Sequence, residues 1–343
     1  MASFTFVDNG LPFDGLTPAL FPLGGAESAV VSLAEALAGR GHSVTVLNKC
    51  AAPLEHKGVL WRPLDGVQTV RKGLVIVNRD PRLLKHVENK RPAVLWLHND
   101  ARYLRKWRHA LPLLRFRLEP IFLSKYHAST WPFQRWWPAK HIIPLGVDPS
   151  FRRRPLDAPP PPRAVFASNP ERGLAPLLDL WVNRIHPAAP QAELHLFTRA
   201  AFYGVTNKAA RLAEPIIAAA ASLQESNVVL HEMRPRSSLA GFYQSMRAML
   251  YWGDAAHAET FCLSIAEAQA SAVPCVARPT GAIAERINHG HTGFLEQDGD
   301  KFSDAAISLL TDDSVWRRCR AHASRAPRSN WSEIAAQFEM LHG

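Results

Sequence analysis

The sequence has no long apolar run, only four cysteines, and no pair of them in a C-x-x-C pattern. No stretch approaches the roughly 18 unbroken apolar residues that a membrane-spanning helix needs. The N-terminal MASFTFVDNG lacks the basic segment and following apolar run of a secretory signal. We therefore expect a cytoplasmic protein with reduced thiols, buried as small hydrophobic side chains and forming neither a zinc site nor a redox pair. The cysteines are Cys50, Cys262, Cys275 and Cys319.

The composition is that of a folded chain long enough for two domains. Of 343 residues, 47% are hydrophobic and 20% are charged, which excludes a disordered protein. The net charge is +10, and most of it lies in residues 1–150, where 20 Lys and Arg face 11 Asp and Glu. Residues 151–343 contain 20 basic and 19 acidic residues and are nearly neutral. The first half is therefore expected to meet something acidic.

Short apolar runs of β type alternate with segments of helical spacing along the whole chain, which predicts parallel sheets with right-handed crossovers. The sequence LDAPPPPR at 156–163 interrupts the alternation with a stiff spacer that neither a helix nor a central strand tolerates. We expect an α/β fold of two Rossmann-like, doubly wound parallel-sheet domains whose strand ends face a central cleft. The expected parts are a first domain at 1–150, a linker at 151–163, a second domain at 164–325 and a terminal helix at 326–343.

The expected strands and helices follow from this alternation. In the first half the strands are Ser3–Val7, 43–47, 74–77, 94–97, 121–123 and 142–144, with a helix at 27–38. In the second half the strands are 164–167, Glu193–Phe197, Val228–His231, 248–252 and 274–277, with helices at 174–181, 239–244 and Leu263–Ala270.

The segment ETFCLSIAE at 259–267 has two glutamates separated by seven residues. It leads from an expected strand into a helix, whose N-terminal N–H groups form an anion site. Glu259 would lie on the loop and Glu267 in the second helical turn, so the two carboxylates could bind hydroxyls at opposite ends of a ligand whose phosphates meet the amides between. The alternative is a surface residue at Glu267 and an acid near the helix cap at Glu259.

This segment and the following AQASAVPCVA, GAIAE (281–285), HGHTGFL (289–295) and Asp300 resemble glycosyltransferase family 4, whose members are retaining enzymes with the GT-B fold. The resemblance implies that Glu267 binds the ribose hydroxyls of a nucleotide and that Glu259 binds hydroxyls of the sugar. The diphosphate would meet the amides near Phe261, Cys262 and Leu263. The family usually has glycine at the positions of Thr260 and Cys262, so these side chains are expected to narrow the donor pocket.

The first half carries further marks of the same family. The glycines of GGAE at 24–27 allow close backbone approach and positive φ at a helix N-terminus. The resemblance puts Gly24 and Gly25 beside the transferred sugar and the phosphate; the alternative is an ordinary loop. His98 ends an expected strand and resembles the family's histidine near acceptor and sugar, although a core histidine has the same pattern. Asp100 is a candidate for orienting the acceptor hydroxyl.

The loop SNPERGL at 168–174 resembles the first loop of the family's C-terminal domain, which implies that Arg172 binds the donor diphosphate. The alternative is a solvated loop charge. The family has a second basic residue where Ser168 or Asn169 stands here, and Arg199 is the candidate that replaces it. PLGVD at 144–148 and the segment 330–341 resemble the family's interdomain crossover and its terminal helix, which returns to the first domain.

The segment 101–118 combines helical apolar spacing with positive charge and no acid. The spacing predicts a helix with one face in the core and a kink or break at Pro112. The alternative is a surface element that contacts anionic lipid or a polyanionic acceptor, together with aromatic and basic residues up to position 140. A nucleic-acid partner is not expected, because no nucleic-acid-binding module accompanies these residues. The apolar positions are Leu104, Trp107, Leu111, Leu114 and Leu118, the basic ones are Arg102, Arg105, Lys106, Arg108, Arg115 and Arg117, and the later residues are Trp131, Phe133, Arg135, Trp136, Trp137 and Lys140.

Together these features predict a retaining hexosyltransferase that moves a sugar from a UDP- or GDP-sugar to a glycan, lipid-linked or other hydroxyl acceptor in bacterial-type surface glycan or glycoconjugate synthesis. Its expected catalytic residues are Glu259, His98 and Arg172. Arg172 and the helix N-terminus would stabilise the departing diphosphate, so we expect neither a metal requirement nor a tightly bound cofactor. The charge of the first half predicts an acceptor that is anionic or held at an anionic membrane surface, at the inner face of the membrane.

Two other functions compete with this prediction. A non-catalytic protein that binds sugar nucleotides or glycans on the same scaffold would explain the missing basic residue and the departures at Thr260 and Cys262. A dinucleotide-dependent oxidoreductase is disfavoured, because no G-x-G-x-x-G follows the first strand.

Overall fold

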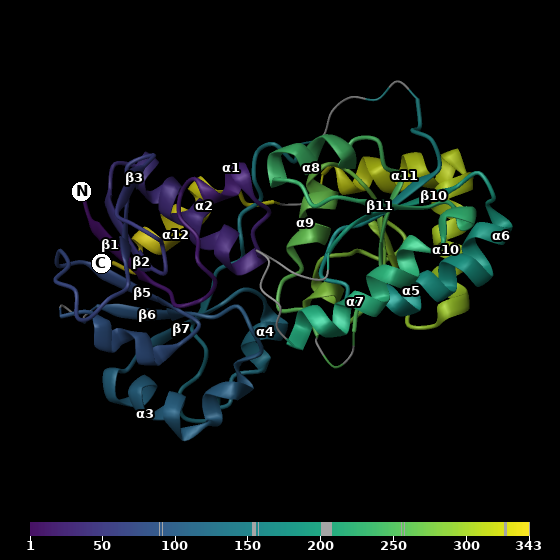
Figure 1. Cartoon of the computed structure of the whole chain (residues 1–343). Helices are drawn as coiled ribbons and strands as arrows, with labels where there is room; N and C mark the ends of the chain where they lie inside the picture. The colour runs from purple at the N-terminus through teal and green to yellow at the C-terminus, as the bar shows by residue number, and fades with distance from the viewer. Residues whose placement is uncertain are drawn as a thin grey trace. The chain divides into compact units, whose positions relative to one another are not determined.

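The computed structural model describes residues 1–88, 90, 92–152, 156, 158–199, 208–254, 256, 258–325 and 328–342. The chain forms two compact units, Met1–Asp148 together with Ser329–Gly343, and Pro149–Arg328 (Figure 1). Each unit contains one sheet with helices packed on it. The expected linker at 151–163 lies partly outside the described residues, because 153–155 and 157 do.

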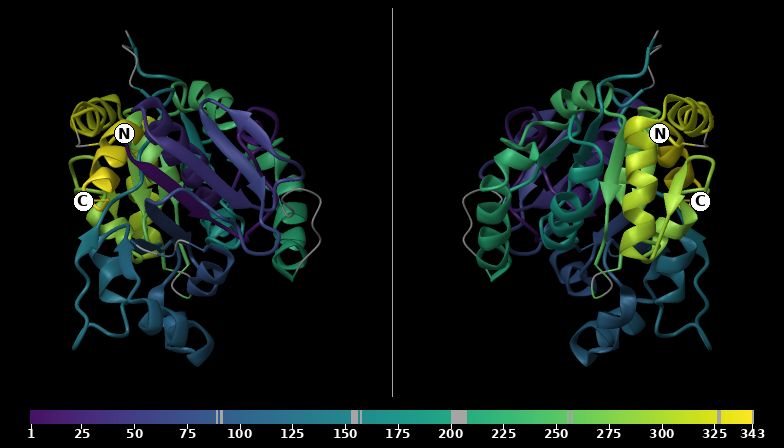
Figure 2. Two further views of the ribbon diagram at one scale, coloured as in Figure 1. Left: turned by 90° about the vertical axis from the view of Figure 1, so that its left-hand side faces the viewer. Right: turned by 90° about the vertical axis from the view of Figure 1, so that its right-hand side faces the viewer.

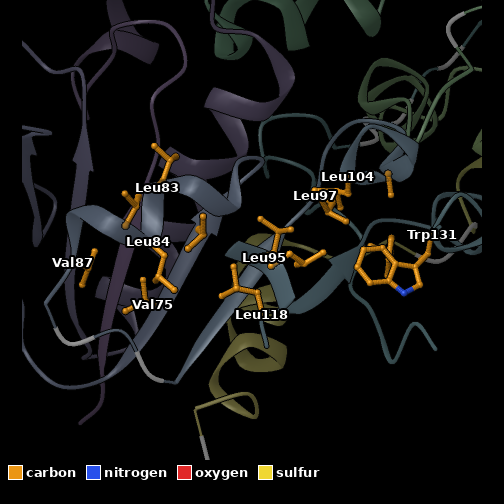
Figure 3. Packing of buried hydrophobic residues seen from close by; sticks show 14 of the residues in the cluster. Val75, Leu83, Leu84, Val87, Leu95, Leu97, Leu104, Leu118 and Trp131 are labelled. Carbon is orange, nitrogen blue, oxygen red and sulfur yellow. The ribbon is translucent and has the colours of Figure 1, made fainter. Parts of the chain in front are cut away.

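The sheet of the first unit has the order β3-β4-β2-β1-β5-β6-β7-β8, and its neighbouring strands are parallel except for the β3–β4 pair. Its central strands are apolar and buried because helices cover a parallel sheet on both faces. Figure 3 shows part of this core, a continuous cluster of buried hydrophobic residues that includes Leu84, Leu95 and Trp131. The strands are β1 Ser3–Val7, β2 Ser43–Asn48, β3 Leu54–His56, β4 Val59–Pro63, β5 Leu74–Asn78, β6 Ala93–Trp96, β7 Glu119–Phe122 and β8 His141–Ile142.

The helices of the first unit come from both ends of the chain. The C-terminal α12 packs against α2 (Figure 1). Glu339 of α12 accepts hydrogen bonds from Arg40 Nε at 2.5 Å and from His42 Nε2 at 2.6 Å, and the Phe338 ring meets Trp96 edge-on. The last described residues therefore belong to the first unit. Its helices are α1 Thr17–Leu20, α2 Gly25–Gly39, α3 Trp107–Phe116, α4 Lys125–Ser129 and α12 Trp331–Glu339, with 3₁₀ segments Pro81–His86 and Ala101–Arg105.

The sheet of the second unit is entirely parallel and has the order β11-β10-β9-β12-β13-β14. Helix α10 packs on β12, β13 and β14 (Figure 2). The strands are β9 Arg163–Phe166, β10 Glu193–Phe197, β11 Val228–His231, β12 Ala248–Tyr251, β13 Cys275–Ala277 and β14 Gly293–Leu295. The helices are α5 Leu174–Leu180, which continues through a π turn at Trp181–Ile185 into α6 His186–Ala188, then α7 Lys208–Ala221, α8 Arg236–Tyr243, α9 Leu263–Ala270, α10 Gly299–Thr311 and α11 Asp313–Ala323, with 3₁₀ segments Gln224–Ser226 and Ala282–Glu285.

Each sheet has one point where the strand order reverses. In the first unit the chain builds outward from β1 toward β3 and then from β5 toward β8. In the second unit the same reversal separates β9 from β12. Parallel sheets bind ligands at the carboxyl ends of the strands beside such a reversal. We therefore expect functional residues on the loops after β1, β5, β9 and β12.

The segment 101–118 differs from its predicted form. A 3₁₀ turn ends at Arg105, Lys106 is extended, and α3 starts at Trp107, so the break lies before Pro112, which is inside the helix. Because the break rotates one segment against the other, the predicted apolar face is not continuous. Leu104, Leu113 and Leu118 are buried, whereas Trp107, Leu111 and Leu114 are 78%, 64% and 39% exposed. The prediction that all five apolar positions face the core was wrong.

Candidate functional site

The loops after β9 and β12 meet at the reversal point of the second unit. Gly173 and Gly253 both have positive φ, of +87° and +71°. A Cβ atom on Gly173 would lie 2.3 Å from the carbonyl oxygen of Gly253, so only glycine permits this approach. The contact holds the β9–α5 loop, with Arg172, against the loop that leads to α9.

Glu259 is anchored at this junction by its side chain and its backbone. Its Oε1 accepts a hydrogen bond from the Tyr251 hydroxyl at 2.5 Å and lies 3.7 Å from Nε of Arg172. Its carbonyl accepts from the amide of Ala282 at 2.7 Å. Burial raises the pKa of Tyr251 well above its usual value, and a hydrogen bond with Ser168 opposes this rise. Tyr251 therefore stays neutral and orients the carboxylate as a fixed donor.

The loop between Glu259 and α9 is buried, and its last residue has an unusual backbone. Thr260, Phe261 and Cys262 are buried, whereas Leu263 is half-buried at the first position of α9. Cys262 has φ +60° at the N-cap, a conformation that favours glycine. Burial raises the pKa of its thiol to about 12, so the thiol is neutral. The expectation that the side chains of Thr260 and Cys262 narrow the donor pocket stays a prediction.

Glu267 lies within α9 and is buried, with only 3% of its surface exposed. Its carboxylate forms an ion pair with Arg236, the first residue of α8. A buried carboxylate needs a partner because desolvation disfavours its charge. The burial excludes the alternative of a solvated surface position for Glu267.

The remaining candidates of the second unit surround the same loop. The Ser168 carbonyl accepts from the Thr198 hydroxyl at 2.7 Å, which joins the loop to the end of β10. The Asn169 side chain accepts from the amide of Glu171 at 3.0 Å and thereby shapes the turn before Arg172. Arg199 follows Thr198 directly and is exposed. Its expected role as the second cation stays a prediction.

The reversal point of the first unit carries a charged cluster of Asp8, Glu27 and Arg79. The Arg79 guanidinium lies 2.9 Å from Asp8 and 3.1 Å from Glu27, and Asn78 also donates to Asp8. Asp8 and Asn78 are buried at the ends of β1 and β5. Sequence reasoning missed this cluster, although the rule that singled out His98, a polar residue directly after an expected apolar strand, applies equally to Asp8 and Asn78.

The two glycines at the start of α2 differ in their surroundings. Gly24 is the N-cap, and a Cβ atom there would lie 2.5 Å from Oε2 of Glu27. Gly25 is the first helical residue, and a Cβ atom there would meet nothing within 4 Å. Neither has the positive φ that the sequence suggested, since Gly24 has φ −60° and Gly25 is helical. A side chain at Gly24 would therefore require the Glu27 carboxylate to move, whereas the backbone angle at Gly24 does not require glycine.

His98 and Asp100 follow β6 and have different environments. His98 is buried and its ring lies 4.6 Å from that of Trp96. Burial and the nearby Arg79 charge hold the pKa of His98 well below its usual value, so the imidazole is neutral. Asp100 accepts hydrogen bonds from the amide and guanidinium of Arg102 and caps the following 3₁₀ turn. Its role toward an acceptor stays a prediction.

Residues 162–312 match the model of the family described as Glycosyl transferases group 1. The chain contains a group 1 glycosyltransferase domain. This domain covers most of the second unit and includes Arg172, Glu259 and Glu267. This match confirms the resemblance of the Glu259 segment to glycosyltransferases, whereas the assignment to family 4 stays a prediction.

Curated relatives match parts of the chain. N-acetyl-alpha-D-glucosaminyl L-malate synthase of Bacillus anthracis is 38% identical over 88 residues, which are 24% of this chain and 23% of the relative. D-inositol 3-phosphate glycosyltransferase of Pseudarthrobacter chlorophenolicus is 43% identical over 82 residues, which are 23% of this chain and 19% of the relative. The matched segments thus span about a quarter or less of each relative's length.

Solved structures match the whole chain at low identity. Anabaena HepE, in complex with UDP and glucose, has a TM-score of 0.74 at 15% identity and covers 99% of both chains. Sucrose-phosphate synthase from Thermosynechococcus elongatus has a TM-score of 0.72 at 16% identity and covers 99% of this chain and 98% of its own. The group 1 domain and its partner unit form a GT-B fold, as expected from the sequence.

None of the described helices is long and apolar enough to cross a membrane. Among the described residues, His, Cys, Asp and Glu form no group of three or more that could hold a metal ion.

Proposed function

We propose that this protein is a retaining glycosyltransferase that transfers a sugar from a nucleotide-diphosphate sugar to a hydroxyl acceptor. The observation that carries the proposal is the arrangement of Arg172, Glu259 and Tyr251 at the reversal point of a group 1 domain. This places one oriented carboxylate and one guanidinium at the edge of the sheet where such folds bind ligands.

The donor roles follow the order of the residues along the loop and α9. Glu267 binds the ribose hydroxyls, and Glu259 binds hydroxyls of the transferred sugar. The amides near Cys262 and Leu263, at the positive end of α9, receive the diphosphate. Arg172 neutralises the charge that develops on the leaving diphosphate. The HepE complex with UDP supports a UDP-sugar donor, with a GDP-sugar as the second candidate, and the names of the curated relatives support glycosyl transfer.

On the acceptor side we assign His98 and Gly24 to the neighbourhood of the reacting sugar. A neutral imidazole can donate or accept one hydrogen bond without adding charge. The acceptor hydroxyl gives its proton to the leaving phosphate, so we name no protein base, and the sugar keeps its anomeric configuration. The acceptor is a glycan or a lipid-linked hydroxyl compound used in surface glycan or glycoconjugate synthesis.

The test is turnover of UDP- and GDP-sugars by the wild type, Glu267→Ala and the control Glu214→Ala, a change at an exposed residue of α7. We expect donor hydrolysis or transfer with the wild type and the control, and its loss in Glu267→Ala. No turnover by any protein, or an unaffected Glu267→Ala, contradicts the proposal. Nucleotide binding without hydrolysis or transfer across a broad acceptor panel would favour the non-catalytic binding protein instead.

We also infer that α3 and the preceding turn touch an anionic membrane. Trp107, Leu111 and Leu114 are exposed on α3, and Trp136 is 61% exposed further along the chain. Apolar side chains among lysines and arginines are the pattern of helices that lie in the interface of anionic lipid. The net positive charge of the first unit favours the same partner. This contact would hold the enzyme at the inner face of the membrane, beside a lipid-linked acceptor.

A further inference from the structure

Arg286 reaches the loop before α9 from a separate part of the chain. It follows the 3₁₀ segment Ala282–Glu285, and its Nε donates a hydrogen bond to the carbonyl oxygen of Phe261. Its guanidinium carbon lies 3.5 Å from the centre of the Phe261 ring. The Arg286 carbonyl in turn accepts from the Gln269 side chain at 2.8 Å, which ties the same residue to the last turn of α9.

The bonded carbonyl belongs to the peptide whose N–H is that of Cys262. A hydrogen bond to the oxygen of a peptide polarises the group and makes its N–H a stronger donor. Arg286 therefore acts on one of the amides to which the proposed function assigns the diphosphate. Burial lowers the pKa of Arg286 only to about 10, so the guanidinium stays protonated at neutral pH.

The contact between Arg286 and Phe261 also holds the backbone next to a residue with an unfavourable conformation. Cys262 has φ +60°, a conformation that side chains other than glycine adopt at a cost. The hydrogen bond and the stacking on Phe261 hold the residue immediately before it. Without them the Phe261–Cys262 peptide could rotate and turn the Cys262 amide away from the helix axis.

We propose that Arg286 is a positioning residue for diphosphate binding, which holds and polarises the Phe261–Cys262 peptide and supplies positive charge behind it. This inference rests on the proposed function, because it assumes a nucleotide diphosphate at the N-terminus of α9. It also provides a second cation in a group 1 domain that has Ser168 and Asn169 in the first loop, besides the exposed Arg199.

The chain offers a matched control at the other end of α9. Arg320 Nη1 donates to the carbonyl of Ala272 at 3.1 Å, and its guanidinium lies 5.4 Å from the Trp316 ring. Ala272 also has positive φ, of +58°. Arg320 thus also combines a carbonyl hydrogen bond with a position over an aromatic ring, at a longer distance and without reaching the diphosphate loop.

The experiment measures calorimetric affinities for UDP and for uridine, with GDP and guanosine as the second pair, in the wild type, Arg286→Met, Arg286→Lys and Arg320→Met. We expect Arg286→Met to weaken UDP binding about tenfold, because the Cys262 amide is then no longer polarised or held toward the diphosphate, and to change uridine binding less than twofold. Arg286→Lys should recover most of the loss. Arg320→Met should lower the melting temperature but keep the ratio of UDP to uridine affinity.

Three results separate the inference from the proposed function. A wild type that binds none of these nucleotides overturns the proposed donor itself. Wild-type binding with an unchanged UDP affinity in Arg286→Met, or an equal loss for UDP and uridine, overturns the positioning role alone. If Arg286→Met does not fold, Arg286→Gln replaces it. Its side-chain amide can still donate to the Phe261 carbonyl, and its affinities for UDP and uridine are compared in the same way.

Discussion

The hydroxyl of Tyr251 donates a hydrogen bond to the carboxylate of Glu259 across 2.5 Å. Tyr251 ends β12 and is fully buried, with its ring stacked on that of Phe166. A rigid strand residue therefore sets the direction of a carboxylate on a loop. If Glu259 binds the transferred sugar, Tyr251 determines where that sugar is held.

Tyr251→Phe is expected to lower the rate of transfer about tenfold, because one hydrogen bond to the Glu259 carboxylate is lost. The affinity for free UDP should stay within twofold, since UDP lacks the sugar. Steady-state kinetics and calorimetry measure the two effects. Tyr243→Phe is the control, because Tyr243 is equally buried in the same unit but its hydroxyl lies near Met249 and Ser264. Equal kinetics for Tyr251→Phe and the wild type would refute the role of Tyr251.

At Cys262 we expect glycine to be more stable than alanine by about 1 kcal/mol, because alanine keeps the cost of the left-handed backbone and glycine removes it. Within α9 alanine should instead be more stable than glycine, so we expect Ala266→Gly to lower the free energy of unfolding by about 1 kcal/mol. Urea unfolding of Cys262→Gly, Cys262→Ala and Ala266→Gly measures the three values. A Cys262→Gly protein less stable than Cys262→Ala would show that φ +60° carries no strain here.

Much of the fold was predictable because buried parallel strands appear as continuous apolar runs, and β10, β11 and α9 have the predicted bounds. The β3–β4 hairpin was missed because both strands are short and only partly buried, and β3 lies at the edge of the sheet. The prediction of a buried apolar face on α3 was wrong, because no pattern in the sequence shows that the backbone of Lys106 is extended.

The site was only partly predictable, because several of its contacts join residues that lie far apart in the sequence. Glu259, Glu267 and Arg172 lie within recognisable motifs. In the sequence Tyr251 resembles a core residue at the end of a strand. No neighbouring residue indicates that its hydroxyl donates a hydrogen bond to Glu259. Arg236 and Arg286 reach the α9 segment from other elements, so their pairing is a property of the tertiary structure.

Glu339 is expected to make stability depend on acid pH. The hydrogen bond from Arg40, with further help from His42, lowers the pKa of Glu339 from 4.5 to about 2. A carboxyl group with a lowered pKa stabilises the fold above its unfolded pKa and loses this contribution as the pH falls through its folded value. The stability difference between the wild type and Glu339→Gln should thus be constant near pH 7 and shrink between pH 4.5 and pH 2. A difference that stays constant down to pH 2 would contradict this account.

The exposed apolar side chains of α3 predict binding to anionic vesicles. Trp107→Ala combined with Leu111→Ser should weaken binding to vesicles that contain phosphatidylglycerol at least about tenfold, since two apolar side chains no longer enter the interface. Leu212→Ser removes another exposed leucine, from the second unit, and should have no effect. Vesicle sedimentation at low and high salt measures the binding of the double variant and of Leu212→Ser. Equal binding by all three proteins, or binding to neutral and anionic vesicles alike, would rule out the α3 contact.

The affinity of Glu267→Gln for UDP, or for GDP if the wild type prefers it, tests the central claim most directly. Glu267 is buried at the site, and a hydrogen bond to a charged group contributes about 1.5–3 kcal/mol. We predict that calorimetry shows binding to the wild type and to the control Glu214→Gln, and binding at least about tenfold weaker in a folded Glu267→Gln. A wild type that binds neither nucleotide, or a Glu267→Gln protein with wild-type affinity, would contradict the assignment of the donor site.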